Sequence, residues 1–334
     1  MKYVTLGCVT IDNIINAYGV KQLNQFGGNA AYGAMGIRLW ESGTVGIVAR
    51  AGNDYPMEWI RELSGLGIDT NGIRSVNKRH TMFSGMIYNE NGDRREVTFD
   101  EDCSSDEADL IEGFLKMTPD EVSSAHEDFA PKAEDIPEAY ADAEGVMIGA
   151  RHYDRQMAYI NWFRQRNPGV KIVMDTGLDY MRPEKAHLLP ALFSKADVVI
   201  PSWDEICRLF PEGCSPEEAV LRLRALGAPT AVVKLGGKGC IICDSQGVIH
   251  RTPAYHLSGV TDPTGAGDSF CGGFTVGLVE TGDPIQAAMY GAVSASYIIS
   301  AFGVLGTRDI TRQMAQTRLE ALNNAQEADS HEKR

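Results

Sequence analysis

Short apolar runs rich in β-branched residues recur along this chain and alternate with longer helical patterns. The runs lie at 3–7, 44–52, 145–150, 171–176, 196–202, 230–236 and 240–245. Helical patterns fall between them, for example at 29–40, 56–67, 155–167 and 215–227. Strands that alternate with helices form βαβ units, whose strands run parallel. We therefore predict a three-layer α/β/α fold, in which helices cover both faces of a mostly parallel central sheet.

One segment breaks this alternation. Residues 81–99, "TMFSGMIYNENGDRREVTF", contain two alternating runs around Asn91-Gly92, a pair that favours a tight hairpin turn. We predict a small β-strand lid here, to which part of 13–26 adds a strand.

Residues 102–144 are crowded with acidic side chains, which indicates a solvated, partly irregular surface insertion. We expect one domain over 1–310, followed by a C-terminal helix and polar tail over 311–334.

Charge and cysteine content exclude several classes of protein. The net charge of −14 argues against a nucleic-acid-binding protein, which would present a basic face. No window reaches the roughly 18 apolar residues of a membrane-spanning helix, and the N-terminus lacks the apolar core of a signal peptide. Cys240 and Cys243 form a C-x-x-C inside a strand-like run, without the second pair of a zinc site. We expect a reduced, cytoplasmic enzyme.

The stretch "TDPTGAGDSFCGGF", 261–274, is the strongest candidate for a functional site. Gly265, Ala266 and Gly267 allow a close backbone approach, and the residues after them have helical composition. Free amides at a helix N-terminus bind anions. Asp268 then falls in the first turn beside such an anion, where its carboxylate suits proton removal from an attacking hydroxyl. The alternative is an aspartate that only caps the helix, after a simple glycine turn.

These residues also resemble a known family. "DPTGAGDSFCGGF" is similar to the C-terminal signature of the ribokinase-like (PfkB) carbohydrate and nucleoside kinases, D-T-x-G-A-G-D, with Pro263 where Thr is commonest. The resemblance extends over roughly 3–307, without the acidic insertion. It implies ATP-dependent phosphorylation of a hydroxyl of a small sugar or sugar-like polyol. It also implies that Asp268 is the general base and that the amides of 265–267 form an anion hole.

The resemblance places the acceptor near the N-terminal half. "GGNAAYGA" resembles the family's Gly-Gly motif, so Gly27, Gly28 and Asn29 would contact the acceptor, although Tyr32 stands where the family usually has Asn. Asp12 matches an early Asp that accepts hydrogen bonds from sugar hydroxyls. The alternatives are a plain strand-to-helix turn for the first motif and a turn at the end of the first strand for Asp12.

Arg151 comes just after a predicted strand, where open α/β sheets form their binding sites. It could recognise an acidic or phosphorylated substrate, and a surface salt bridge is the alternative.

The nucleotide is expected along the C-terminal half. "PSWDEICRLF" resembles the family's P-N-x-x-E segment, in which Glu205 would help to place Mg²⁺ through water, while Ser202 replaces the usual Asn. "VVKLGGKG" resembles the strand and turn that hold the nucleotide, with Lys234 facing phosphate and Gly236 and Gly239 giving backbone access. Glycine-rich turns after strands are common, so this stretch alone predicts little. It matches neither a dinucleotide fingerprint nor a P-loop.

Three further expectations follow from the resemblance. Asp262 matches a ligand of a monovalent cation such as K⁺. The partners are a small sugar and ATP, with no nucleic acid or membrane, and the exposed face of the lid is a candidate homodimer interface.

Two alternatives to a sugar kinase stay open. One is a nucleoside kinase of the same fold, with Tyr32, Phe83 or Tyr88 as a platform for the base. The other is a catalytically silent sugar-binding regulator.

Overall fold

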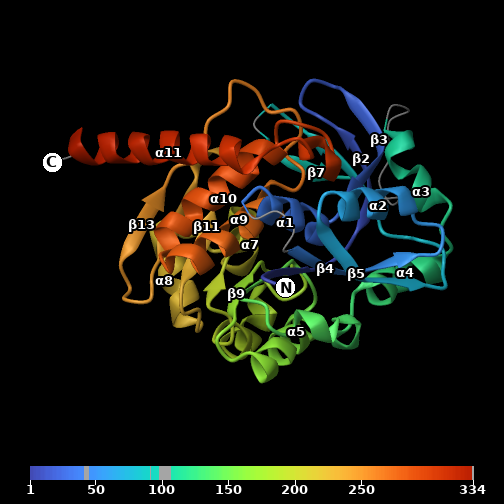
Figure 1. Cartoon of the computed structure of the whole chain (residues 1–334), viewed down its shortest axis with the longest axis horizontal. Helices are drawn as coiled ribbons and strands as arrows, with labels where there is room; N and C mark the ends of the chain where they lie inside the picture. Colours follow the sequence, from blue (N-terminus) through green and yellow to red (C-terminus); the bar gives the residue numbers. More distant parts are fainter. Residues whose placement is uncertain (41–44, 91, 98–106, 333–334) are drawn as a thin grey trace.

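A nine-stranded sheet forms the centre of the computed structural model, which describes residues 1–40, 45–90, 92–97 and 107–332 (Figure 1). The strand β1 (Tyr3–Leu6) lies between β8 (Gly145–Ile148) and β4 (Val45–Gly52) and runs parallel to both. The other strands are β5 (Ile68–Val76) outside β4 and then, outside β8, β9 (Lys171–Met174), β10 (Val198–Val199), β11 (Ala231–Lys234), β12 (Cys240–Cys243) and β13 (Ile249–Thr252). Among these strands, β12 pairs antiparallel with β11, and β13 pairs antiparallel with β12; the other pairs are parallel. Each predicted apolar run contains one of these strands, so the prediction of a mostly parallel sheet is confirmed.

The order of the strands reverses at β1. From β1 the chain builds β4 and β5 on one side, and it later returns to build β8 to β13 on the other side. At such a reversal the connections after neighbouring strands leave in opposite directions and open a crevice at the carboxyl ends of the strands. A ligand site is therefore expected beyond the ends of β1 and β8.

Helices cover both faces of the sheet and enclose two separate cores. The helices α1 (Asn29–Arg38), α2 (Met57–Gly65), α9 (Ala266–Thr281) and α10 (Pro284–Ile298) pack on one face. On the other lie α5 (Tyr153–Arg166), α6 (Leu189–Phe193), α7 (Trp203–Leu209) and α8 (Pro216–Ala225). Along β1, Tyr3 enters the first core while Val4 and Leu6 enter the second, because side chains alternate along a strand. The three-layer prediction is confirmed.

A second, four-stranded sheet lies beside the body. Its order is β3 (Lys21–Gly27), β2 (Thr10–Ile15), β6 (Phe83–Tyr88) and β7 (Arg94–Glu96). The strands β6 and β7 pair antiparallel, which confirms the predicted hairpin, although Asn91 and the end of the predicted segment lie outside the described residues. Much of the expected lid segment, about 13–26, lies in this sheet, as the end of β2 and as β3. Strand β2 begins at Thr10 and carries Asp12 at a bulge, so Asp12 belongs to the small sheet and does not follow β1 in a turn.

The acidic segment is less exposed than its composition indicates. From 107 onward it forms α3 (Glu112–Leu115), α4 (Pro119–Phe129) and short 3-10 turns. Phe129 and Tyr140 are buried, and the buried Asp135 pairs with Arg50 at 2.6 Å. The expectation of a solvated insertion is therefore wrong for this part. Apolar side chains spaced among the acids anchor the segment to the body, and a count of charges does not reveal them.

The chain ends in α11 (Arg312–Glu332), whose later turns extend away from the body (Figure 1). Its first turns are docked, because Ala315 and Leu322 are buried and the guanidinium of Arg318 lies 3.6 Å from the centre of the Tyr297 ring. The predicted C-terminal helix is thus present. None of the helices in the described ranges is long and apolar enough to cross a membrane.

Glycines hold α9 unusually close to its neighbours. A Cβ placed on Gly272 would lie 2.2 Å from the carbonyl oxygen of Gly33, and one placed on Gly36 would lie 2.4 Å from the carbonyl oxygen of Ser269. The helices α1 and α9 therefore touch backbone to backbone, and neither can shift without the other. This contact fixes where the first turn of α9 lies relative to the sheet.

We predict that Gly272→Ala lowers the free energy of unfolding by about 1–3 kcal/mol, because the added methyl group forces two packed backbones apart. The control is Gly65→Ala in α2, where nothing lies within 4 Å of the added Cβ. Its stability should be unchanged or raised by up to about 1 kcal/mol. Chemical denaturation of both variants measures the difference. Equal stability of the two variants would contradict the tight α1–α9 contact.

Candidate active site

The predicted site residues gather along the carboxyl ends of the parallel strands, on both sides of the reversal at β1. Asn29 begins α1, Arg151 follows β8, and Lys234 ends β11. The first turn of α9 points at the same edge, because Gly267 lies against Lys234: a Cβ on Gly267 would be 3.1 Å from the Lys234 Nζ. Residues from the two halves of the sequence therefore meet at one edge of the sheet.

The N-terminus of α9 has the geometry that its sequence predicts. Gly265 is the N-cap residue with a φ of 76°, and its Cα is covered by the Tyr32 ring, which a Cβ would approach to 2.2 Å. The Ala266 amide donates to the Pro263 carbonyl at 3.1 Å. Within the described residues, no hydrogen bond engages the amides of Gly265 and Gly267. Two of the three predicted anion-binding donors are therefore available.

Asp268 lies in the first turn of α9, as predicted, and is half-buried. Burial first, and then the Asp175 carboxylate, raise the pKa of its carboxyl group, while Lys234, Arg94 and Arg151 oppose the shift, and the pKa is about 6. A carboxylate whose pKa lies just below neutrality is deprotonated at pH 7 and still accepts a proton readily.

Asp12 is only 2% exposed and is held by the small sheet. Its Oδ1 accepts hydrogen bonds from the Thr10 hydroxyl at 2.6 Å and from the Ser84 hydroxyl at 2.5 Å. Burial raises the pKa of Asp12 to about 6, although both hydroxyls lower it. Gly27 makes room for this carboxylate, since a Cβ there would lie 1.8 Å from its Oδ2.

The Gly-Gly motif is a close contact between β3 and the end of β1. Gly28 has a φ of 105°, and a Cβ on it would lie 2.4 Å from the Cys8 carbonyl oxygen. The Asn29 side chain is already engaged: its Oδ1 accepts from the Cys8 amide at 2.8 Å, and its Nδ2 donates to the Ala150 carbonyl at 3.0 Å. Asn29 therefore ties the ends of β1 and β8 together, and its predicted contact with acceptor hydroxyls stays a prediction.

A buried ion pair lies on the other side of Asp268. The Lys234 Nζ is 2.9 Å from both carboxylate oxygens of Asp175, which follows β9. Burial alone would lower the pKa of Lys234, but the Asp175 carboxylate outweighs it and keeps the amine protonated. This pair places a positive charge directly beneath the first turn of α9.

Ser202 and Glu205 cap the start of α7. The Glu205 Oε2 accepts from the Ser202 amide at 2.7 Å and from the Ser202 hydroxyl at 2.8 Å. Burial, together with the Asp175 carboxylate, raises the pKa of Glu205 to about 7. The capping geometry fixes the Glu205 carboxyl group near the Lys234–Asp175 pair.

The two glycines after β11 differ. Gly236 has a φ of 59° and open space around its Cα. Gly239 instead packs on the end of β13, where a Cβ would lie 2.0 Å from the Thr252 carbonyl oxygen. Backbone access to a ligand is therefore open at Gly236, whereas Gly239 is required by the fold of the β11–β12 turn.

Asp262 is 1% exposed and lies before α9. Its Oδ1 accepts from the Thr264 amide at 2.9 Å and from the Thr264 hydroxyl at 2.6 Å. Its Oδ2 is buried and has no hydrogen-bond partner among the described residues. Burial raises the pKa of Asp262, while the Thr264 hydrogen bonds and the backbone of Gly303 oppose the shift. An unpartnered buried carboxylate oxygen is the kind of atom that a cation would satisfy.

Sequence reasoning missed two residues of this site. Asp175 directly follows a buried strand at the carboxyl edge, a signal that was available in "KIVMDT". Ser84 gave no such signal, because only the parallel pairing of β2 with β6 brings it opposite Asp12. Local sequence identifies acids at strand ends, but it does not identify partners across sheets.

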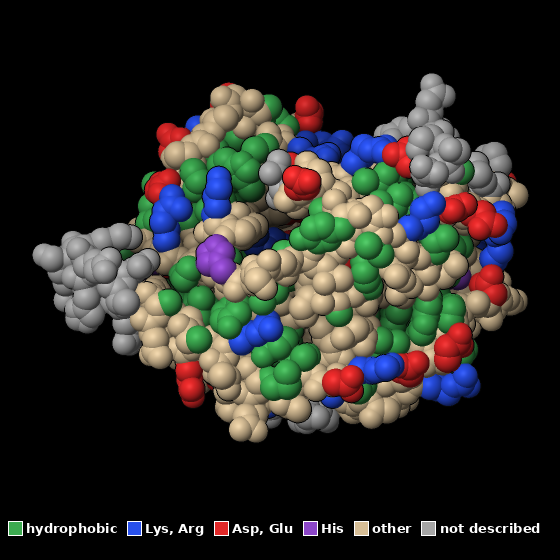
Figure 2. Space-filling view, turned by 90° about the horizontal axis from the view of Figure 1, so that it is seen from above, with side chains coloured by type: hydrophobic (Ala, Val, Ile, Leu, Met, Phe, Trp, Pro, Cys, Tyr) green, Lys and Arg blue, Asp and Glu red, His purple; other side chains and the backbone are tan. Residues whose placement is uncertain are grey.

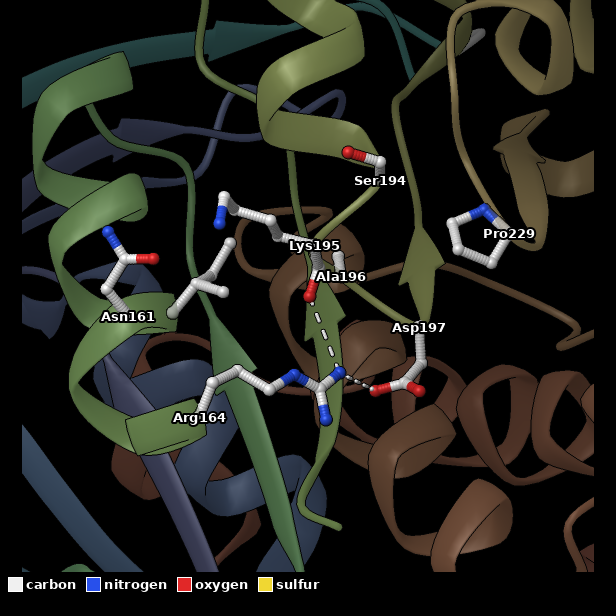
Figure 3. Close-up of a pocket in the computed structure, with 8 residues that line it drawn as sticks. Asn161, Arg164, Ser194, Lys195, Ala196, Asp197 and Pro229 are labelled. Atoms are coloured by element: carbon white, nitrogen blue, oxygen red, sulfur yellow. Dashed lines mark hydrogen bonds and ion pairs between the residues drawn. The ribbon is translucent and has the colours of Figure 1, made fainter. Parts of the chain in front are cut away.

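An open pocket of about 380 Å³ lies elsewhere (Figure 3). Its lining includes Asn161, Arg164 and Asp197, and Asp197 precedes β10, so the cavity opens at the amino ends of the strands. Arg164 spans it and is satisfied by Asp197 at 2.7 Å and by the Val170 carbonyl at 2.6 Å. It touches none of the predicted site residues and supports no role in the chemistry.

Residues 125–309, more than half of the chain, match the family model described as pfkB family carbohydrate kinase. The chain belongs to this family. It is thus an ATP-binding kinase that transfers phosphate to a hydroxyl of a sugar or a nucleoside. The match begins inside the acidic segment and contains the α9 motif, whereas Asp12 and Asn29 lie outside it.

Individual relatives differ in acceptor. A cytidine kinase of Thermococcus kodakarensis is 28% identical over 85% of this chain and 90% of its own length. A 5-dehydro-2-deoxygluconokinase of Bacillus subtilis is 28% identical over 64% of this chain and 66% of its own. A putative ribokinase of E. coli, solved with ATP and Mg²⁺, superposes with a TM-score of 0.69 at 18% identity, covering 96% of this chain and 99% of that one. The last likeness confirms the fold.

We predict that Asp12→Asn is more stable than the parent protein above pH 6, by the order of 1–3 kcal/mol. The folded pKa of Asp12, about 6, exceeds the ordinary value of 3.8. The folded state therefore binds the proton more tightly, and the parent loses stability as the pH rises from about 4 to 6. Urea denaturation at pH 4.5 and 7.5 tests this. A stability gain in the variant that does not grow with pH would contradict the proposed burial of this charge.

Proposed function

We propose that this protein phosphorylates a hydroxyl of a small sugar or sugar-like polyol, with Asp268 as the general base. The observation that carries the proposal is the position of Asp268 in the first turn of α9, next to two unengaged amides and above the Lys234 ammonium. A base, an anion site and a fixed cation thus meet within one helical turn. These are the parts that phosphoryl transfer requires.

Each group has a task in this proposal. Asp12, Gly28 and the neighbouring Asn29 line the acceptor side, where the Asp12 carboxylate accepts from sugar hydroxyls. Asp268 removes the proton from the hydroxyl that attacks the γ-phosphoryl group of ATP. The amides at the start of α9 and the helix dipole stabilise the negative charge of the transferring group.

The nucleotide side is formed by Ser202, Glu205, Lys234 and the Gly236 turn. Lys234 is kept charged by Asp175 and can turn part of its hydrogen-bonding capacity to phosphate. Glu205 would help to hold Mg²⁺ through water, and the ion would neutralise phosphate charge. The described residues contain no cluster of three or more metal-binding side chains, and Mg²⁺ bound largely by water and phosphate needs no such cluster.

The small sheet is proposed to act as a lid. Strand β2 supplies Asp12 and β6 supplies Ser84, so the sheet contributes directly to the acceptor side. Closure over the acceptor would exclude water, which otherwise competes for the phosphoryl group. A homodimer through the exposed face of this sheet stays a prediction.

A polyol acceptor is favoured over a nucleoside by the state of the aromatic residues. Tyr32 is 2% exposed beneath Gly265, and Tyr88 is 6% exposed with its hydroxyl 2.9 Å from the Thr264 hydroxyl. Neither of these two rings offers a free face for stacking a base. Phe83, the third candidate, is only half-buried, with its ring against Gly113 and near His80, so the nucleoside alternative rests on this ring. A silent sugar-binding regulator is disfavoured by the intact base and free amides. It would bind sugar without consuming ATP.

We predict that Asp268→Asn lowers kcat by about 10²–10⁴ while the Kd for MgATP stays within a few-fold. The parent kcat should fall below about pH 6, where Asp268 becomes protonated, and the variant should lose this limb. Initial rates of ADP release and calorimetric ATP binding measure both. The matched control is Glu58→Gln, an exposed acid in the first turn of α2. Undiminished turnover in Asp268→Asn would remove the mechanism.

We further propose that Asp262 binds a monovalent cation, based on its unpartnered buried Oδ2. Turnover should then be higher in K⁺ than in Na⁺ at equal ionic strength. In Asp262→Asn, the ratio of the two rates should fall towards one, because the neutral amide binds a cation poorly. A K⁺ effect that persists in the variant would place the cation elsewhere.

A further inference from the structure

Two strands of the small sheet, β2 and β6, carry matched side chains on the face that points to the body. They pair parallel, with Asp12 opposite Ser84 and Ile14 opposite Met86. Because side chains alternate along a strand, Asn16 and Tyr88 come next on the same face. One end of this face thus carries the Asp12 carboxylate, and the other end lies about 13 Å further along the strands.

This second end of the face contacts the loop 261–264, which leads directly into α9. The Asn16 Nδ2 donates a hydrogen bond to the Thr261 carbonyl at 2.8 Å. The Tyr88 hydroxyl lies 2.9 Å from the Thr264 hydroxyl. Both side chains of the small sheet are buried, at 5% and 6% exposed. Two side chains of the small sheet therefore hold the loop immediately before the N-cap residue Gly265.

The surrounding groups fix the direction of the Tyr88 hydrogen bond. The Thr264 hydroxyl has one hydrogen, and it lies 2.6 Å from the Asp262 Oδ1, which as a carboxylate oxygen is a stronger acceptor than a phenol. The Thr264 oxygen is then left to accept from Tyr88. The other neighbour of the Tyr88 hydroxyl is the Met86 sulfur at 3.6 Å, a weak acceptor. Tyr88 therefore donates to Thr264 and orients the side chain that hydrogen-bonds to Asp262.

The small sheet and the loop are each held from a second side. On the outer face of the sheet, the Asn13 Nδ2 donates to the Leu110 carbonyl at 3.0 Å, and Ile15 and Ile87 pack against a buried cluster that contains Leu110. On the far side of the loop, the Thr261 amide donates to the Ile299 carbonyl at 2.8 Å. A displacement of the sheet would therefore act on the loop, because neither part is free to relax alone.

We propose that Tyr88 and Asn16 are positioning residues for phosphoryl transfer, which hold the loop 261–264 and thereby the amides of Gly265 and Gly267. The inference rests on the proposed function and adds a link between its acceptor side and its anion site. Asp12 and Tyr88 lie on the same face of one small sheet, so the anion site keeps its geometry only while that sheet is in place. Neither positioning residue needs to touch a substrate.

Amide hydrogen exchange of the full chain tests this link without any substrate. Tyr88→Phe keeps the buried ring and removes only the hydroxyl that donates to Thr264. We expect the hydrogen-bonded amides within 261–268 to exchange about 3- to 10-fold faster in this variant, the effect of one hydrogen bond, with exchange in β1 and β8 unchanged. The matched control is Tyr140→Phe, which removes a buried hydroxyl that donates to the Asp69 carboxylate at 2.9 Å. It should leave exchange at 261–268 unchanged.

Kinetics test the consequence for the reaction. ADP release from MgATP is measured with ribose, fructose, gluconate and cytidine, and the fastest acceptor of the parent protein is used for the variants. Tyr88→Phe should lower kcat by about 10- to 100-fold and leave the KM for MgATP within about threefold, because displaced donors weaken the transition state more than the bound ground state. Tyr140→Phe should match the parent in both values.

Two further variants identify the route. Thr264→Val removes the acceptor of the Tyr88 hydrogen bond, so combining it with Tyr88→Phe should lower kcat no further than Thr264→Val alone. Asn16→Asp keeps the oxygen that accepts from the Tyr18 and Val20 amides but turns an oxygen towards the Thr261 carbonyl. It should lower kcat and speed exchange in the same loop, and it tests the second contact if Tyr88→Phe folds poorly.

The outcomes separate this inference from the proposed function. Parent-like exchange at 261–268 in Tyr88→Phe, or a parent-like kcat, overturns the positioning role and leaves the kinase mechanism standing. A KM for MgATP that rises as far as kcat falls also overturns it, since the hydroxyl would then serve nucleotide binding. Additive losses in the double variant overturn the route through Thr264. If the parent phosphorylates none of the four acceptors, the proposed function fails, and the exchange result alone supports or overturns the hold of the small sheet on the loop.

Discussion

The contact between α1 and α9 is the constraint on which the site depends. Glycines let the two helices meet backbone to backbone, and the same α1 begins at Asn29, which ties β1 to β8. One rigid unit therefore carries both Asn29 and the first turn of α9. Because packed backbones cannot slide past each other, Asp268 keeps its distance from Asn29 without help from loops. A reaction that depends on holding its reacting groups in a fixed geometry needs preorganisation of this kind.

The price of this arrangement is electrostatic. Three carboxylates, Asp12, Asp262 and Asp268, are drawn out of water into one crevice, and burial raises the pKa of each. Lys234, Arg94 and Arg151 offset part of the cost for Asp268. Functional sites often keep unfavourable interactions of this kind, because their chemistry requires them although they lower the stability of the fold. Two sheets and two helices contact the site, and their packing holds the buried carboxylates in place despite this cost. The surface shown in Figure 2, in contrast, carries acidic and basic side chains interspersed with one another.

Much of the fold could be predicted because its signals are local. Strand runs such as 3–7 and 171–176 and the hairpin of 81–99 follow from periodicity and turn residues, and each is present. The acidic segment was misjudged, because Phe129 and Tyr140 are buried by contacts far away in the chain. The start of the small sheet at Thr10 could not be predicted for a related reason: Asp12 joins this sheet only through pairing with β3 and β6.

The sequence by itself determined the family, the helix start at Gly265 and the base candidate Asp268, because these depend on neighbouring residues in one turn. Only the tertiary structure decided which side chains from other segments lie around the first turn of α9. It placed Asp175 beside Lys234, Ser84 beside Asp12 and Asn29 beside the Ala150 carbonyl. Pairing and burial are properties of separate segments brought together by the sheet. Which charged and polar groups face one another is therefore visible only in the folded chain.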